Sequence, residues 1–125
     1  MRQAHPTLTP NELAIMKVIW RLEKATVREV YEAIRERRDI AYTTVMTMMK
    51  ILEEKGYLKK TRADRAYLYR PSQPRHQVIG AMVRDFLDRV FDGAATPLLV
   101  QLAKDGRLSK DDKDTIRRLA KEIDE

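Results

Sequence analysis

The chain has 125 residues, with 25 Lys+Arg against 19 Asp+Glu, a formal net charge of +6 and no cysteine. This length predicts one small domain or two modest halves, and a 43% share of hydrophobic residues argues against disorder. The missing cysteines exclude disulfides, thiolate nucleophiles and cysteine-based zinc sites. No apolar run approaches a membrane helix and the first ten residues lack the core of a signal peptide. We therefore expect a cytoplasmic protein without membrane insertion, cofactor or metal.

Two clear helix starts open the chain. Residues 9–12 (TPNE) combine an N-cap threonine, a proline at the first helical position and a glutamate at the third, which predicts a helix to about residue 22. Residues 26–29 (TVRE) repeat the capping box and predict a second helix to about Arg37. Both helices carry an apolar face, so we expect them to share one core.

A third helix and a β-hairpin come next. The helix is predicted from about Thr43 to Lys55, because Gly56 suits a left-handed C-cap. At 100° per residue, one side of this helix is apolar and is predicted to be core: Val45, Met48, Met49 and Leu52. Two short runs, residues 57–62 and 66–71, contain β-favouring residues and flank a polar bend, which predicts a hairpin.

The remainder of the chain predicts three more helices. A helix after Pro74 has a wide apolar face and ends at Gly93. A short helix to about residue 104 is predicted to be capped by Thr96 and Pro97, and a last helix is predicted to be capped by Ser109. The expected order is therefore three helices, a hairpin and three helices.

Three helices followed by a basic hairpin is the layout of a winged helix-turn-helix. Residues 1–70 hold 15 Lys+Arg and 9 Asp+Glu, whereas residues 71–125 hold 10 of each. A solvated basic surface accounts for such an excess as well as a polyanion partner does. The predicted fold class is mainly α with a small β-hairpin. We expect a winged-helix DNA-binding domain over residues 1–72 and a helical dimerisation domain over residues 73–125.

The predicted DNA-binding residues come from the third helix and the hairpin. The polar face of the helix has no acidic residue in its first two turns, and its short side chains permit close approach to base edges and thymine methyl groups. The hairpin supplies cations for phosphates. The candidate residues are Thr43, Thr44, Met46, Thr47 and Lys50 on the helix, and Lys59, Lys60, Arg62 and Arg65 on the hairpin. Ile51 is interpreted as an ordinary exposed apolar residue.

The C-terminal half is predicted to pair with a second copy of the chain. Three helices in residues 75–125 make a poor independent core, and the fourth helix has a wider apolar face than one neighbour covers. A two-fold homodimer would also match a palindromic DNA site. The predicted interface comprises Ile79, Met82, Val83, Phe86, Val90, Phe91, Leu98, Leu99, Leu102, Leu119 and Ile123. Packing of these helices on the N-terminal half is the alternative.

Several segments resemble one known family. These are residues 12–20 (ELAIMKVIW), 41–58 (AYTTVMTMMKILEEKGYL), 67–71 (YLYRP), 86–93 (FLDRVFDG) and 98–104 (LLVQLAK). Together they resemble the BlaI/MecI/CopY family of transcriptional repressors, over about residues 8–123. The resemblance implies a homodimer on an inverted-repeat operator in double-stranded DNA, repressing β-lactamase or related antibiotic-resistance or stress genes.

Two departures from the family pattern bear on regulation. The copper-sensing branch uses C-terminal cysteines, which this chain lacks, so metal sensing is disfavoured. In staphylococcal members, a protease activated by a membrane sensor cuts an Asn-Phe bond. The aligned pair here is Gln101 and Leu102, a candidate proteolytic site with a different sequence.

Three other classes of function are alternatives to a DNA-binding repressor. An enzyme is disfavoured, because two histidines, two serines and four glycines form no catalytic or phosphate-binding motif. A winged-helix protein–protein adaptor without DNA binding is the main alternative, although an adaptor has no need of a basic hairpin. RNA binding is disfavoured, because the third helix offers no aromatic stacking platform.

Overall fold

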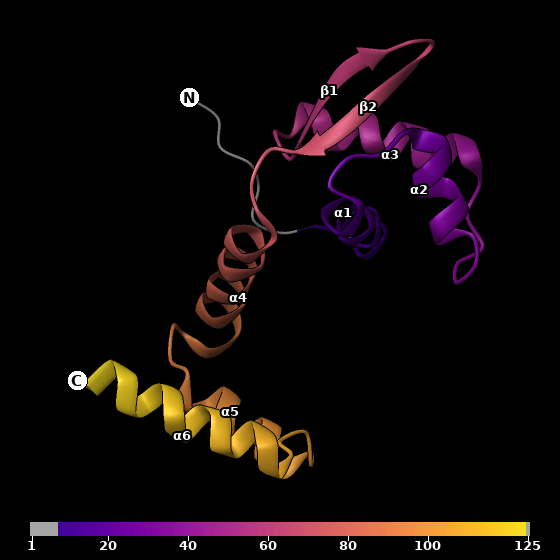
Figure 1. Ribbon diagram of the computed structural model, residues 1–125. Helices are drawn as coiled ribbons and strands as arrows, with labels where there is room; N and C mark the ends of the chain where they lie inside the picture. Colours follow the sequence, from indigo (N-terminus) through magenta and orange to yellow (C-terminus); the bar gives the residue numbers. More distant parts are fainter. Residues whose placement is uncertain (1–7, 125) are drawn as a thin grey trace. The chain divides into compact units, whose positions relative to one another are not determined.

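The computed structural model describes residues 8–124, and the chain divides into two compact units that meet between Val83 and Arg84. The elements are α1 (Pro10–Leu22), α2 (Val27–Ile34), α3 (Tyr42–Glu54), β1 (Leu58–Ala63), β2 (Ala66–Pro71), α4 (Arg75–Phe91), α5 (Thr96–Lys104) and α6 (Lys110–Asp124) (Figure 1). The predicted mainly helical winged-helix class is confirmed. The first compact unit includes the beginning of α4, so it extends past residue 72, and the functional division at residues 72/73 stays a prediction.

Both predicted capping boxes begin their helices. The Thr9 and Thr26 hydroxyls each accept the backbone N–H three residues later, at 3.1 Å, and the glutamates at those positions accept the threonine N–H groups in return. α2 nevertheless ends at Ile34, before the predicted Arg37. The cause is a tightened last turn, in which the Ile34 carbonyl accepts from the N–H groups of both Arg37 and Arg38, at 2.9 and 3.0 Å.

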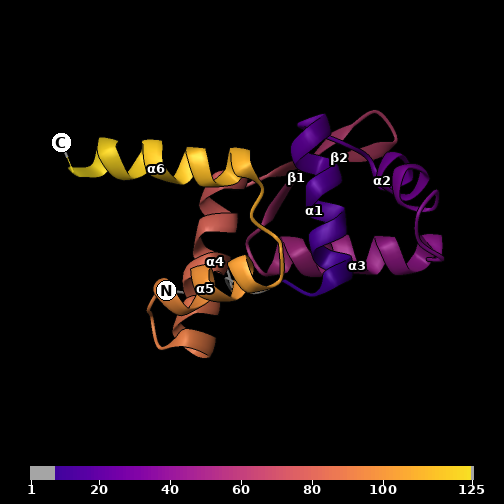
Figure 2. The same ribbon diagram turned by 90° about the horizontal axis from the view of Figure 1, so that it is seen from below.

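The first unit has a closed hydrophobic core. Figure 2 shows α1 lying across α3, and α2 packs against both helices. The apolar faces predicted for the three helices meet inside, together with the base of the hairpin. The largest fully buried side chains are Ile15, Met16, Ile19, Val30, Val45, Met49, Leu52 and Leu58. Val78 at the start of α4 completes this core.

The hairpin is anchored to the helices at its base. Its register pairs Leu58 with Pro71 and Ala63 with Ala66, so the turn is Asp64 and Arg65. Tyr69 also exchanges two backbone hydrogen bonds with Ala25, in the loop between α1 and α2, at 3.0 and 2.8 Å. This extra bridge fixes the hairpin beside α2 and α3.

The second unit, residues 84–124, is built differently. Among its described side chains, residues 84–123, none is buried. The predicted cap of the last helix is confirmed, because the Ser109 hydroxyl accepts the Asp112 N–H at 3.0 Å. The predicted cap of the short helix is wrong: α5 begins at Thr96, its N-cap is Ala95, and no side chain bonds to that end.

Candidate nucleic-acid interface

One face of α3 is held in the core, so its other face is exposed. Val45, Met49 and Leu52 are completely buried, which orients the helix. All five predicted α3 residues lie on the exposed side: Thr43, Thr44, Met46, Thr47 and Lys50. Met46 exposes 45% of its surface and Ile51 37%, so Met46 stays a candidate groove contact and Ile51 an ordinary exposed residue.

The register of the hairpin separates the predicted basic residues. Lys60 pairs with Tyr69 and Arg62 pairs with Tyr67, and since paired residues share a face these four lie on one side. Lys59 pairs with Arg70 on the other side. The structure therefore places Lys60 and Arg62 together and Lys59 away from them.

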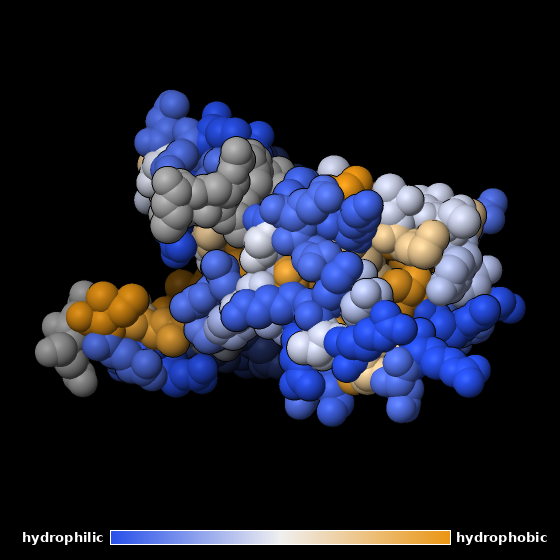
Figure 3. Space-filling model, turned by 90° about the horizontal axis from the view of Figure 1, so that it is seen from above, coloured by the Kyte–Doolittle hydropathy of each residue, from blue (hydrophilic) through white to orange (hydrophobic). Residues whose placement is uncertain are grey.

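A groove of about 740 Å³ lies between α3, the hairpin and the first turn of α2. It contains four cationic residues and no carboxylate among its lining residues, which are Thr26, Val27, Arg28, Tyr42, Met46, Thr47, Lys50, Lys60, Arg65, Ala66, Tyr67 and Tyr69. Figure 3, which faces the hairpin, shows blue hydrophilic side chains around paler and orange ones over this part of the molecule. A polyanion is the ligand class that such a surface favours.

Seven residues of this groove are not among the predicted DNA-binding residues, and three of them take part in cation–π contacts: Arg28, Tyr42 and Tyr67. The Arg28 guanidinium lies 5.1 Å from the centre of the Tyr42 ring, and the Lys60 ammonium lies 4.5 Å from that of Tyr67. These cation–π contacts hold the long basic side chains at the groove. The strand alternation could have placed Tyr67, whereas Arg28 and Tyr42 meet only through the packing of α2 on α3.

The N-terminus of α3 is open to an anion. Its N-cap, Ala41, provides no side-chain hydrogen bond, and the first turn has no acidic residue. α1 and α2, by contrast, have both capping boxes. N–H groups without a cap and the positive end of the helix dipole attract phosphate oxygens. Tyr42 is the first residue at this end of α3.

Lys60 is less free than the sequence suggests. Its Nζ lies 3.5 Å from Glu53 Oε1 on α3, which ties β1 to the end of that helix. The pKa of the neighbouring Tyr69 is raised, chiefly because the residue is buried, although the positive charge of Lys60 opposes the change. Tyr69 is therefore a neutral part of the groove wall.

A partly buried ion pair fixes the other end of α3. Glu12 on α1 is 5% exposed and accepts from Lys55 Nζ at 2.9 and 3.1 Å. Burial by itself raises the pKa of Glu12, but hydrogen bonds from Lys55 and the Thr9 backbone outweigh it and hold that pKa below its usual value. Burial and the Glu12 charge raise the pKa of the adjacent Tyr57 to about 12, so its hydroxyl stays protonated.

The predicted dimer residues are apolar, and none of them is fully buried. Six of them are exposed, namely Val83, Phe86, Val90, Leu99, Leu119 and Ile123, and five are half-buried, namely Ile79, Met82, Phe91, Leu98 and Leu102. Met82 is a special case, because it packs against the core of the first unit. Orange side chains gather near the end of α6 in Figure 3, where Ile123 is 81% exposed.

The candidate proteolytic site lies inside α5. Gln101 is exposed and its amide donates to the Asp105 carboxylate at 3.2 and 3.3 Å, while Leu102 is half-buried. Within residues 8–124, no set of three or more His, Asp or Glu side chains comes together as a metal site. Over the same described residues, every helix is too short or too polar to span a bilayer.

Comparisons with known proteins show the family to which the chain belongs. The chain matches the family described as penicillinase repressor over residues 8–122. It is 37% identical over 115 residues to the transcriptional regulator BlaI of Mycobacterium tuberculosis, covering 90% of this chain and 82% of that protein. It is 24% identical over 117 residues to the penicillinase repressor of Bacillus licheniformis, covering 94% and 91%.

A solved structure gives the same fold. It is the monomeric form of B. licheniformis BlaI in complex with the blaP half-operator, with a TM-score of 0.51, 27% identity and coverage of 60% of this chain and 90% of that one. These relatives are a transcriptional regulator and a penicillinase repressor. The chain therefore belongs to the penicillinase repressor family.

Proposed function

We propose that this protein is a sequence-specific repressor that binds an inverted-repeat operator as a homodimer. The observation that carries the proposal is the groove around α3, which joins an exposed threonine face to cations from three elements without a carboxylate. Such a surface suits duplex DNA, in which base edges lie between two rows of phosphates. An adaptor without DNA binding has no use for this arrangement of charge.

α3 is assigned the reading of base edges in the major groove. Thr43, Thr47 and Lys50 lie on its exposed face, with Thr44 and Met46 at the flanks. Threonine hydroxyls bond base edges or phosphates, and Thr and Met methyl groups suit the thymine methyl. Because none of these side chains is acidic, the helix can approach the phosphates on both sides.

Phosphate contacts are assigned to the hairpin and to α2. Lys60, Arg62 and Arg65 belong to the hairpin, and Arg28 to the opposite wall of the groove. These contacts add affinity with little dependence on sequence and make binding sensitive to salt. Lys59 faces away from Lys60, so its contact would be to a more distant phosphate or to none.

The homodimer is supported by the lack of buried residues in the second unit. Helices α5 and α6 carry apolar side chains and yet bury none of them fully. A second copy would cover this surface, and a two-fold dimer would place two reading helices on the two half-sites of a palindrome. One domain on one half-site binds weakly, so pairing supplies most of the operator affinity.

Induction by proteolysis would act through the same C-terminal arm, residues 84–124. α5 spans Thr96–Lys104, has no side-chain cap and includes no buried residue, so it opens at small cost. Cleavage between Gln101 and Leu102 would separate α6 from the rest of the chain and weaken the dimer. The protease would have to accept a glutamine–leucine bond.

The test is selection of binding sites from random duplex DNA by the full chain at about 150 mM salt, where non-specific phosphate contacts are weakened. We expect enrichment of an inverted repeat whose half-sites lie about one helical turn apart. A pool without any enriched inverted repeat would overturn the proposal. An enriched single half-site would retain DNA reading and reject the homodimer.

A further inference from the structure

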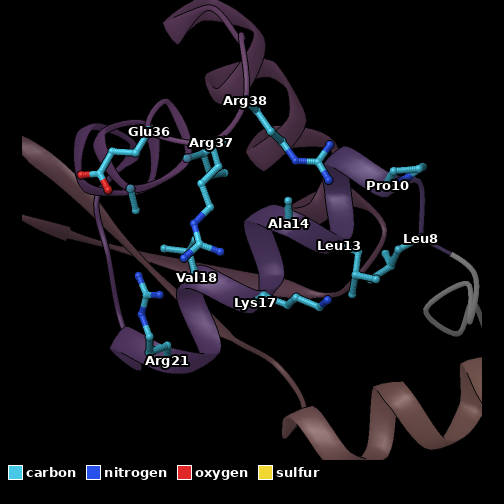
Figure 4. Close-up of a pocket in the computed structure, with 12 residues that line it drawn as sticks. Leu8, Pro10, Leu13, Ala14, Lys17, Val18, Arg21, Glu36, Arg37 and Arg38 are labelled. Atoms are coloured by element: carbon cyan, nitrogen blue, oxygen red, sulfur yellow. The ribbon is translucent and has the colours of Figure 1, made fainter. Parts of the chain in front are cut away.

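A second groove lies on the first unit and shares no residue with the candidate DNA interface. It has a volume of about 700 Å³ and lies between α1 and the end of α2 (Figure 4). The lining residues are Leu8, Pro10, Leu13, Ala14, Lys17, Val18, Arg21, Ala33, Ile34, Glu36, Arg37 and Arg38. This volume is in the range of sites that hold small organic molecules.

The floor of this groove is apolar. Leu8, Val18 and Ile34 belong to the hydrophobic core and present an edge to the groove, and Leu13 and Ala33 pack against the same core. The floor is therefore rigid, because these side chains are held by the packing of α1 on α2. A hydrocarbon chain or ring placed here would cover apolar surface and gain the free energy of its burial.

The rim carries an excess of positive charge that the chain itself does not neutralise. In the described part of the chain, Lys17, Arg21, Arg37 and Arg38 form no ion pair with an acidic residue. Arg38 donates instead to the neutral Asn11 amide oxygen at 2.7 Å. Glu36 is the one carboxylate among the lining residues. Four cations thus face one acid around an apolar floor.

The directions of the side chains concentrate the excess positive charge at one place in the groove. In Figure 4 the guanidinium groups of Arg21 and Arg37 point toward one another across the groove, and the carboxylate of Glu36 points away from them. Two guanidinium groups that converge without an acid between them repel each other. An anion between them removes this repulsion, and a carboxylate fits guanidinium donors in a bidentate geometry.

We infer that this groove binds an amphiphilic carboxylate, with the carboxylate between Arg21 and Arg37 and the hydrocarbon part along the floor formed by α1 and α2. The inference is independent of the proposed DNA binding. It follows from two properties that occur together here, an apolar floor and an unneutralised arginine pair. Neither property alone selects this ligand class.

The test uses decanoate, kept below its micelle-forming concentration, with the full chain followed by backbone amide NMR. We expect decanoate to shift the resonances of Leu13, Ala14, Val18 and Ala33. Decanol has the tail without the charge, and inorganic phosphate has a charge without the tail. Each should bind at least about tenfold more weakly than decanoate, because each lacks one of the two contributions.

Variants locate the site. Arg21→Gln combined with Arg37→Gln should weaken decanoate at least about tenfold, because two charge-assisted contacts are lost. Lys24→Gln combined with Arg75→Gln removes the same charge from exposed positions outside the groove and should leave binding unchanged. Ala14→Phe keeps every charge but places a large side chain in the groove, and it should also weaken decanoate binding. Circular dichroism establishes that each variant is folded.

Several results would contradict the inference. These are the absence of any decanoate-dependent shift at the groove, decanol or phosphate binding as tightly as decanoate, and equal weakening in the two double variants. The first result would leave the groove to a different occupant, such as an acidic segment of a protein. Equal weakening in the two double variants would show that decanoate binding depends only on the net charge of the protein.

Discussion

The two compact units of this chain differ in how they hold themselves together. Residues 8–83 enclose a core in which eight large side chains are fully buried, whereas no described side chain of residues 84–123 is buried. The charge is divided in the same direction, since residues 1–70 hold the whole excess of Lys+Arg over Asp+Glu. The first unit therefore has a core of its own, and the lack of one in the second unit supports the proposal that it pairs with a second copy.

The hydrophobic effect explains the difference. An amphipathic helix gains little stability in water until its apolar face is covered, and short helices are marginal alone. In the first unit α1, α2 and α3 cover one another. In the second, Val90, Leu99 and Leu119 expose 51%, 40% and 46% of their surfaces. The proposed homodimer would cover these side chains.

The largest expected effect comes from placing a charge on that surface. Phe86→Asp should convert a dimer into a monomer, because it buries a carboxylate in an apolar interface. Loss of the linked second domain should lower operator affinity by about 100- to 10,000-fold. Sedimentation and a DNA-binding titration measure the two effects. Arg84→Asp, on the same helix and away from Phe86, is the control, and equal loss in both variants would reject the interface.

The second prediction compares the substitution of a core residue with the substitution of a residue in the C-terminal arm. Ile15→Ala should lower the free energy of unfolding by about 2–5 kcal/mol, since it opens a cavity at a fully buried position. Leu119→Ala should change the unfolding of dilute monomer by less than about 0.5 kcal/mol and should instead weaken dimerisation. Denaturant titrations at low and high protein concentration separate these cases. A similar loss from both substitutions in dilute protein would place a closed core in the arm.

The third prediction concerns pH and the ion pair behind α3. The pKa of Glu12 is lowered in the folded protein, so its ionisation stabilises the fold above the unfolded value near 4.5, and this contribution is lost as pH falls through the folded value. Glu12→Gln should cost about 1–2 kcal/mol at pH 7, and the cost should shrink in acid. Glu29→Gln alters the equivalent exposed capping box and should have a smaller effect. A pH-independent difference for Glu12→Gln would contradict the assignment.

The smallest effects are expected within the candidate DNA interface. They separate the recognition of base sequence from the electrostatic attraction to phosphates. Thr47→Ala should reduce discrimination between operator variants by about 1 kcal/mol, with little change in salt dependence. Lys60→Ala should weaken all sequences alike and lower the salt slope by about one unit. Binding titrations on matched and mismatched duplexes at several salt concentrations test both. Identical profiles for the two variants would reject this division.

The helices of the first unit were well predicted, because the capping signals that begin α1 and α2 lie within four consecutive residues of the sequence. The capping boxes at Thr9 and Thr26 bring together residues three positions apart, and periodicity alone separates Met49 in the core from Thr47 outside. The end of α2 was less accessible, because a tightened turn at Ile34 leaves no clear mark in the sequence. The missing capping bond at Thr96 is a similar case, because α5 does begin at this Thr-Pro pair but its N-cap is Ala95 and no side chain bonds to that end.

The candidate interface was predictable in part. The face of α3 follows from its period, but the side on which each hairpin residue lies depends on strand register, so Lys59 was grouped with Lys60 although the two face opposite ways. Arg28 and Tyr42 meet through tertiary packing, which sequence spacing does not reveal. For the same reason the groove between α1 and α2 had no signal in the sequence.

The comparison between the two units is tested most directly by amide hydrogen exchange of the full chain over a range of protein concentrations. We expect protection of residues 84–124 to rise with concentration, while protection of the core helices α1 and α3 stays constant. That result would show that the arm folds firmly only when it pairs. Strong protection of residues 84–124 at the lowest concentration, or equal concentration dependence in both units, would contradict the account.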